Sequence, residues 1–293
     1  MSPSRRAMRR PPSPLPWIAA SLTVLAGALP ALALPADPPP SGADLGKVLA
    51  DRAAAVVTVQ VVVQIKMGGE MGSQMGEKQE FQTEASCVVI DPNGLVLCSN
   101  TLLGGYMSLI QRVMGGSKME MTATPTQLKV LFADEAKPLE AKLLVRDTDL
   151  DLAWLQVKAP EGKKFAYVDL ARSATPKVGD PFVAIRRLDK FFDRTATVYE
   201  GRIGGTVKKP RTLYVPTATA ESSLGLPALS PTGEVLGILV LQFPDEAGDL
   251  DAGPFGRLET SARVQDLIRG FILPAADVVK ATKRAAESGK SGK

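Results

Sequence analysis

The sequence predicts an all-β protein built from two barrels, with one helix near its C-terminal end. Apolar, β-branched runs recur along the chain and are separated by turn residues, which is typical of a sandwich or of closed barrels. The chain has 293 residues, and its series of strands breaks at "KAPEGKK" (158–164), which favours two barrels side by side. The segment "PAADVVKATKRAAE" (274–287) starts with proline and has helical apolar spacing, which predicts the helix.

The predicted elements begin with a short helix in "KVLADRAAA" (47–55). Barrel one is expected to span residues 47–160 and barrel two residues 161–273, followed by the helix and a tail at 274–293. The predicted strands are 55–65, 82–90, 95–99, 127–133, 139–147 and 151–159 in barrel one, and 165–170, 181–187, 195–205, 212–218 and 234–242 in barrel two.

Residues 1–33 are predicted to be an export signal. They carry four arginines, then an apolar run, and end in Ala31-Leu32-Ala33, which is the pattern of a cleaved signal peptide. The alternative is an uncut membrane anchor, although the run is short for a span of about 20 residues and contains Pro30. Residues 34–46 are predicted to be a proline-rich linker. We therefore expect an exported protein, periplasmic or extracellular.

The charge of the chain resides in the predicted signal. Of 35 basic residues four lie in residues 1–33, so 31 basic and 31 acidic residues remain in the rest. A near-neutral chain gives no electrostatic reason to expect nucleic acid as a partner, and membrane contact is expected only if the signal stays uncut. No phosphate loop, dinucleotide fingerprint or zinc-ligand spacing is found, so we expect no cofactor.

The two cysteines, Cys87 and Cys98, flank a predicted hairpin around "DPNG". A two-residue loop at Pro92-Asn93 would place them directly opposite each other, which allows a disulfide in an exported protein. A bulge at Gly94 would shift the register by one residue and separate the sulfurs. The disulfide is therefore possible in one register only.

Seven of the nine methionines lie in two predicted loops, 66–80 and 106–125. Met67, Met71 and Met75 are spaced four apart among glycines, and thioethers can hold Cu(I) in exported proteins. The alternative is an adaptable apolar cover over a groove or a partner surface. In the segment "RRLDKFFDR" (186–194), we expect the two adjacent phenylalanines, Phe191 and Phe192, to be buried under the barrel rather than exposed.

Five blocks of the sequence, in order, resemble HtrA/Deg-type serine proteases of the trypsin-like class. "ASCVVIDPNGLVLCSNTLL" is similar to the segment that ends in the catalytic histidine, and "LEAKLLVRDTDLDLAWLQV" to the one that carries the catalytic aspartate. "VGDPFVAI", "SSLGLPALSPTGEVLGI" and "GFILPAADVVKATKRAAE" are similar to the following blocks, the second of which carries the nucleophilic serine. The resemblance covers residues 47–287 and implies two six-stranded antiparallel barrels with a C-terminal helix.

The departures from this pattern concern the catalytic triad itself. The family's histidine falls on Thr101 and its serine on Leu224, while its aspartate is kept as Asp151. The chain contains no histidine at all, although histidine moves the proton in triad chemistry. We expect no catalytic residues, and we expect Asp151 to be a hydrogen-bonded polar group near the start of a strand. Around Leu224 and Leu226 the former site becomes either a small apolar patch or ordinary core.

Three functions follow from these observations. The first is a non-catalytic homologue that binds a protein or peptide, in the former cleft or on the methionine-rich loops. The second is an active serine endopeptidase with a rearranged nucleophile, Ser222 or Ser223, although Ser223 should face away from the former cleft because neighbouring residues of an extended segment alternate. The third is a metal binder that uses Met67, Met71 and Met75 for copper.

Overall fold

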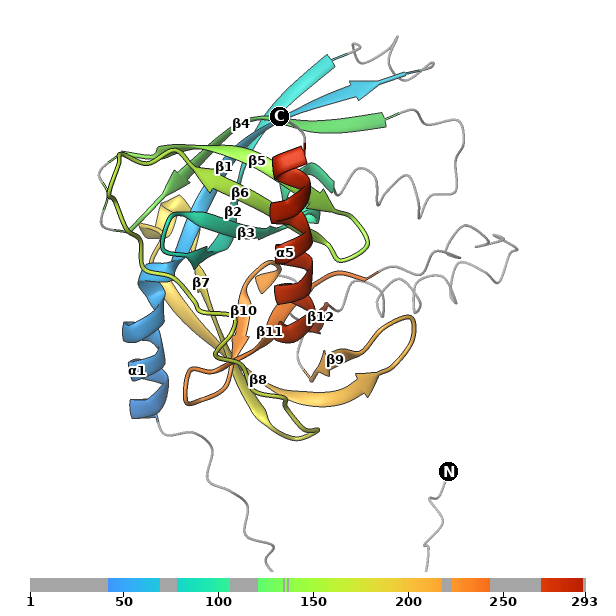
Figure 1. Cartoon of the computed structure of the whole chain (residues 1–293). Coiled ribbons are helices and arrows are strands. Elements are labelled where there is room, and N and C mark those ends of the chain that lie inside the picture. The colour runs from blue at the N-terminus through green and yellow to red at the C-terminus, as the bar shows by residue number, and fades with distance from the viewer. Residues whose placement is uncertain are drawn as a thin grey trace, which may run out of the picture. The chain divides into compact units, whose positions relative to one another are not determined.

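The structure is a computed structural model that describes residues 42–68, 78–105, 121–133, 135, 137–217, 223–242 and 270–291. All of them belong to the second of two units into which the chain divides, Pro39–Lys293. Their strands form two closed six-stranded barrels followed by a helix, which confirms the predicted fold class (Figure 1). None of the helices in these ranges is long and apolar enough to cross a membrane. The predicted signal lies outside the described residues.

Barrel one has the strand order β1-β2-β3-β6-β5-β4. Its first strand shows why the sequence forms a barrel wall, because Val57, Val59, Val61 and Val63 are fully buried and alternate with residues that face outward. The six strands are β1 (Val56–Met67), β2 (Lys78–Asp91), β3 (Leu95–Ser99), β4 (Met121–Leu131), β5 (Leu139–Asp147) and β6 (Leu152–Val157).

Barrel two has the order β10-β11-β12-β9-β8-β7. Two of its strands, β10 and β12, were not predicted, because they have only three and four residues. The six strands are β7 (Pro181–Arg187), β8 (Ala196–Val207), β9 (Leu213–Pro216), β10 (Pro227–Leu229), β11 (Val235–Val240) and β12 (Phe271–Pro274).

The predicted strand at 165–170 is wrong. Phe165, Val168 and Leu170 are buried, but this segment is an extended link between the barrels that joins no sheet. It is attached by single main-chain bonds, from Phe165 N to Pro92 O (3.0 Å) and from Val168 N to Val89 O (2.9 Å). Apolar residues that pack onto a core from a linker give the same sequence pattern as a strand.

Two helices flank the barrels. α1 (Gly42–Arg52) begins five residues before the predicted helix, so the end of the predicted proline-rich linker is helical. α5 (Ala275–Ser291) packs its buried residues Val278 and Ala281 into a core shared by both barrels. Trp154 Nε1 of barrel one donates to Thr282 Oγ1 of this helix at 3.0 Å. α5 therefore ties the barrels together (Figure 1).

An arginine joins the barrels at another point of their boundary. Arg187, the last residue of β7, donates from Nε to Val56 O (2.6 Å) and from Nη2 to Ala53 O (2.8 Å). Its main-chain N–H donates to Ser86 Oγ of barrel one at 3.3 Å. One planar side chain thus satisfies carbonyls at the entry to β1 from the other barrel.

Candidate functional site: a buried aspartate without a histidine

Asp151 lies in the turn between β5 and β6, directly before β6 begins. It is 3% exposed, and its φ of 57° is left-handed, which aspartate tolerates better than most residues. Its carbonyl accepts the N–H of Asn100 at 3.0 Å. This bond holds the turn against the end of β3, where Thr101 follows.

Main-chain and hydroxyl groups donate hydrogen bonds to the Asp151 carboxylate. Thr101 N donates to Oδ1 at 2.7 Å, while Ser99 Oγ and Leu241 N donate to Oδ2 at 2.8 Å and 3.0 Å. Burial raises the pKa of this carboxyl, and hydrogen bonds from the main chain of Leu241 and from Thr101 and Ser99 oppose the rise. The aspartate is therefore occupied by main-chain and hydroxyl donors.

Thr101 stands where the resemblance places the histidine. It begins the short turn η2 (Thr101–Gly105) and is only 9% exposed. Its hydroxyl and N–H both bond to Asp151. Neither group takes up and releases a proton near neutral pH as an imidazole does.

Leu224 stands where the resemblance places the nucleophile. It is 5% exposed and Leu226 is fully buried, so the expected alternatives resolve in favour of core rather than a surface patch. Gly225 N donates to Leu239 O of β11 at 2.7 Å. A side chain at Gly225, whose φ is 78°, would meet the carbonyl carbon of Cys98 at 3.0 Å, so only glycine allows this close approach to β3.

These contacts bring the three predicted positions to one place between the barrels. The Leu224 segment rests on the end of β3, Thr101 follows that end, and Asp151 bonds to it and to Leu241. Ser223, the predicted fallback nucleophile, is 1% exposed. Ser222 lies outside the described residues.

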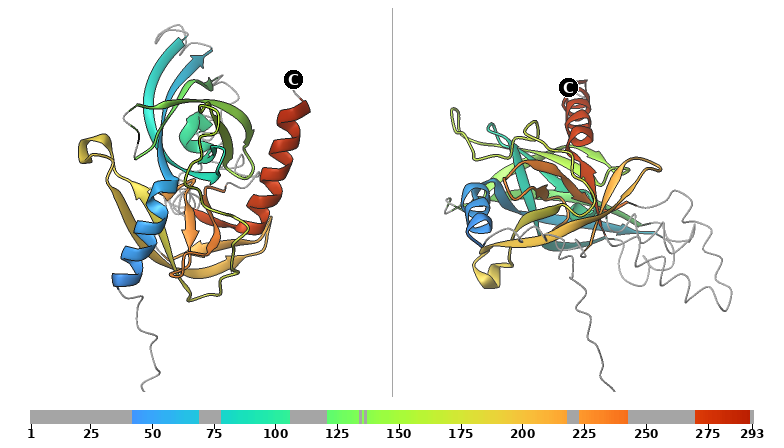
Figure 2. Two further views of the ribbon diagram at one scale, coloured as in Figure 1. Left: turned by 60° about the vertical axis from the view of Figure 1, so that its left-hand side comes forward. Right: turned by 90° about the horizontal axis from the view of Figure 1, so that it is seen from below.

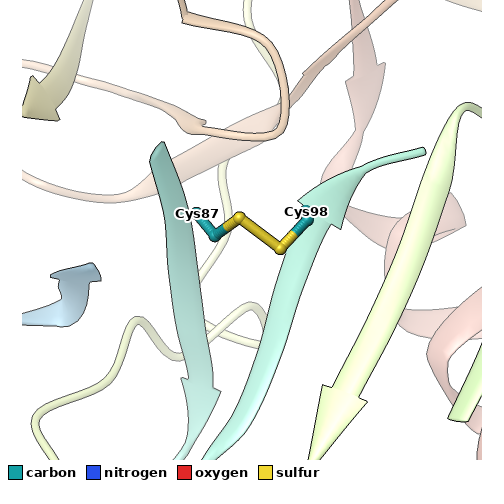
Figure 3. Close-up of a disulfide and its surroundings, with 2 residues drawn as sticks. All are labelled: Cys87 and Cys98. Atoms are coloured by element: carbon teal, nitrogen blue, oxygen red, sulfur yellow. A yellow bond between two sulfur atoms is a disulfide. The ribbon is translucent and has the colours of Figure 1, made fainter. Parts of the chain in front are cut away.

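The two cysteines form a disulfide beside this place, with a Cα–Cα distance of 4.7 Å (Figure 3). Gly94 has a φ of 84° and its N–H bonds to Asp91 O, so the bulged turn does form. A second irregularity between Val89 and Asp91 shifts the register back, and Val88 again pairs with Leu97. The expectation that the bulge would separate the sulfurs is therefore wrong.

The structure brings the ends of the two methionine-rich loops together, since Met67 of β1 pairs in register with Met121 of β4. Met71 and Met75 lie outside the described residues. No group of three histidine, cysteine, aspartate or glutamate side chains that could hold a metal occurs in the described ranges. The copper site stays a prediction.

The expected burial of Phe191 and Phe192 is wrong, because they are 83% and 57% exposed. They lie at the tip of the β7–β8 hairpin in the short turn η3 (Lys190–Phe192). Asp189 caps this turn, and its carboxylate accepts the N–H of Phe191 at 2.8 Å. The aspartate at the cap position and the charged residues around the pair were the signals for an exposed turn.

Two closed six-stranded barrels, with Thr101, Asp151 and Leu224 brought together between them, are the arrangement that the resemblance implies. Residues 85–238, just over half of the chain, match the family model of the trypsin-like peptidase domain. The chain belongs to this family. The match runs from β2 into β11, so it includes Thr101, Asp151 and Leu224 of this trypsin-like peptidase domain. No curated protein matches the chain.

Proposed function

We propose that this trypsin-like peptidase homologue is catalytically inactive, is exported, and acts by binding a protein or peptide. The observation that carries the proposal is the side chain at position 101, a threonine with no imidazole, whose main-chain N–H donates to Asp151 Oδ1 at 2.7 Å. In triad chemistry the aspartate accepts a hydrogen bond from a histidine, which in turn takes the proton of the serine. Here a threonine occupies the place of that histidine, and the chain has none elsewhere.

The nucleophile position supports the same conclusion. Leu224 has no atom that can attack a carbonyl, and it fills the space as a buried side chain. Ser223 could replace it only with a base within hydrogen-bond reach and with access for a substrate. At 1% exposure its hydroxyl has no access to a substrate in this conformation. An endopeptidase with a rearranged nucleophile is therefore the weaker alternative.

The binding role follows from what the fold retains. Its core depends on alternating apolar residues, whereas the chemistry depends on a few particular side chains, so the fold can persist without activity. With 31 basic and 31 acidic residues after the predicted signal, a protein or peptide is a better partner than nucleic acid. The disulfide between Cys87 and Cys98 agrees with an oxidising, exported location.

Labelling with a fluorophosphonate probe tests the loss of activity. We expect no covalent adduct on the purified protein comprising residues 34–293, and no cleavage of unfolded casein. Ser223→Ala serves as the matched variant, with Ser222→Ala beside it. An adduct mapped to either serine by mass spectrometry, lost in the corresponding variant, would establish the endopeptidase instead.

Copper binding is a second candidate, favoured by the register that places Met67 opposite Met121. The two residues belong to the two methionine-rich loops, so the strand register brings the main chains of those loops together. Competition for Cu(I) with a chelator should show binding that Met67→Leu, Met71→Leu and Met75→Leu together abolish. Equal competition by wild type and the triple variant would exclude these methionines.

A further inference from the structure

The tip of the β7–β8 hairpin carries an exposed aromatic pair, Phe191 and Phe192, here called the aromatic tip. Their ring centroids are 5.1 Å apart and the rings meet edge to face. Single exposed apolar residues are ordinary on a protein surface, but two adjacent phenylalanines with 83% and 57% exposure form a contiguous apolar projection. Such a projection is typical of a contact site.

The aromatic tip is held in a fixed conformation. Thr195 Oγ1 donates to Phe192 O at 2.8 Å, and Asp193 and Arg194 have left-handed φ angles of 52° and 50°. Non-glycine residues keep this conformation only where the surrounding structure fixes it. Arg194 donates to both carboxylate oxygens of Glu84, at 2.6 Å and 3.1 Å, which ties the hairpin to β2. A turn whose main chain is already fixed loses less entropy on binding than a flexible one.

Beside the hairpin, β2 presents an incomplete strand edge. β2 pairs with β1 from Lys78 to Val88, but on its other side β3 pairs only from Val88 onward. Residues 80–84, here called the β2 edge, therefore have a neighbouring strand on one side alone within the described part of the chain. The left view of Figure 2 shows the β1–β2 and β7–β8 hairpins on the same side of the molecule.

A groove of about 380 Å³ lies beside the β2 edge and reaches Asp189 and Lys190, the residues directly before the aromatic tip. The charges at this groove balance. Glu84 and Asp189 are acidic, whereas Lys190, and Arg194 bonded to Glu84, are basic. A groove without excess charge does not select nucleic acid or an anionic membrane. The residues that line it are Gln60, Gln82, Thr83, Glu84, Asp189 and Lys190.

We propose that the β2 edge binds an extended segment of a partner protein as an added strand, with apolar side chains of that segment packed on the aromatic tip. Unpaired main-chain groups of a strand edge recognise another extended main chain, and neighbouring side chains select its sequence. The proposal rests on the binding part of the proposed function and gives it a location. It does not depend on whether the former catalytic site is inactive.

The probe is a phage-displayed library of random ten-residue peptides, selected on the protein comprising residues 34–293. We expect enriched peptides with apolar residues at alternate positions, and protection of amides in residues 80–84 from hydrogen exchange when such a peptide binds. Phe191→Ala with Phe192→Ala should weaken the binding of a synthetic enriched peptide at least tenfold. Tyr167→Ala, an exposed aromatic on the link between the barrels, is the matched control and should change nothing.

Proline substitutions test the strand pairing separately. Neighbouring residues of a strand direct their N–H groups to opposite edges, so Gln82→Pro and Thr83→Pro remove one inward and one outward donor. The inward N–H pairs with β1 and supports the fold, so the variant that loses less thermal stability is the one that lacks the outward N–H. That variant should bind the peptide at least tenfold more weakly than wild type.

Absence of enriched peptides, protection elsewhere, or full binding by the phenylalanine double variant would overturn the proposal. So would an oligomer that sedimentation shows to dissociate in that double variant, because the aromatic tip would then be a self-interface. None of these results would alter the fluorophosphonate test.

Discussion

Asp151→Ala is expected to lower the free energy of unfolding by about 3–5 kcal/mol while changing no catalytic activity. The wild-type carboxylate accepts hydrogen bonds from Ser99 Oγ, Thr101 N and Leu241 N at distances of 2.7 to 3.0 Å. The two main-chain donors belong to different barrels. Removing the acceptor therefore weakens both the turn before β6 and the contact between the barrels.

The magnitude follows from the separate terms. A buried donor left without a partner costs about 1–3 kcal/mol, so three donors give about 3 kcal/mol at the low end. Alanine at the left-handed φ of Asp151, which is 57°, adds about 1–2 kcal/mol. Part of this is offset because burial of the carboxylate is unfavourable, as its raised pKa shows. Asp151→Asn keeps one acceptor oxygen and tolerates the backbone conformation, so it should cost about half as much.

Urea denaturation of the protein comprising residues 34–293, followed by tryptophan fluorescence, measures these differences. Asp149→Ala is the matched control, because Asp149 is an exposed carboxylate in the same turn, and it should stay within about 0.5 kcal/mol of wild type. The reasoning fails if Asp151→Ala is as stable as the control. It also fails if wild type hydrolyses a peptide and the Asp151 variants lose that activity without losing stability.

Three further results are expected. Arg187→Ala should lower the unfolding free energy by about 2–4 kcal/mol, and Arg187→Lys should recover less than half, because an ammonium cannot reach both carbonyls; equal stability of the lysine variant would contradict this. Cys87→Ala with Cys98→Ala should cost about 3 kcal/mol, from a closed loop with a sequence separation of 11 residues, and an unchanged urea midpoint would exclude it. Burial raises the pKa of Glu84, but hydrogen bonds from Arg194 and Gln60 outweigh this and leave it below 4.5. Its stabilisation is therefore present above pH 4.5 and lost as the pH falls through the lowered value, and the unfolding midpoint of Glu84→Gln should lack that acid-dependent loss.

The long strands of the fold could be predicted because their alternation is strong. In β1 every second residue from Val57 to Ile65 is buried, and this pattern is visible in the sequence. β10 and β12 were missed because three or four residues give no periodicity. The segment around Phe165 gave the opposite error, a predicted strand that does not form. Burial alone does not show whether a segment joins a sheet.

The positions of the candidate site were predicted by resemblance, but its interactions were not. Nothing in the sequence indicates that Leu241, ninety residues after Asp151, donates its N–H to that carboxylate. The disulfide shows the same limit, because a bulge at Gly94 and a second irregularity near Val89 cancel each other in the register. Long-range contacts and compensating distortions depend on the assembled barrels, not on local patterns.

The burial of the candidate site bears directly on where the proposed partner would bind. Leu226 belongs to the core shared by both barrels, and Leu224, Thr101 and Ser223 are each less than a tenth exposed. A partner could reach these residues only by displacing core side chains, at a cost of several kcal/mol for each one exposed. The aromatic tip differs, because its side chains are already exposed on a turn whose main chain is fixed. Contact with a partner there would bury apolar surface without loss from the core. In this domain, recognition is therefore expected on the flank of the barrels and not between them.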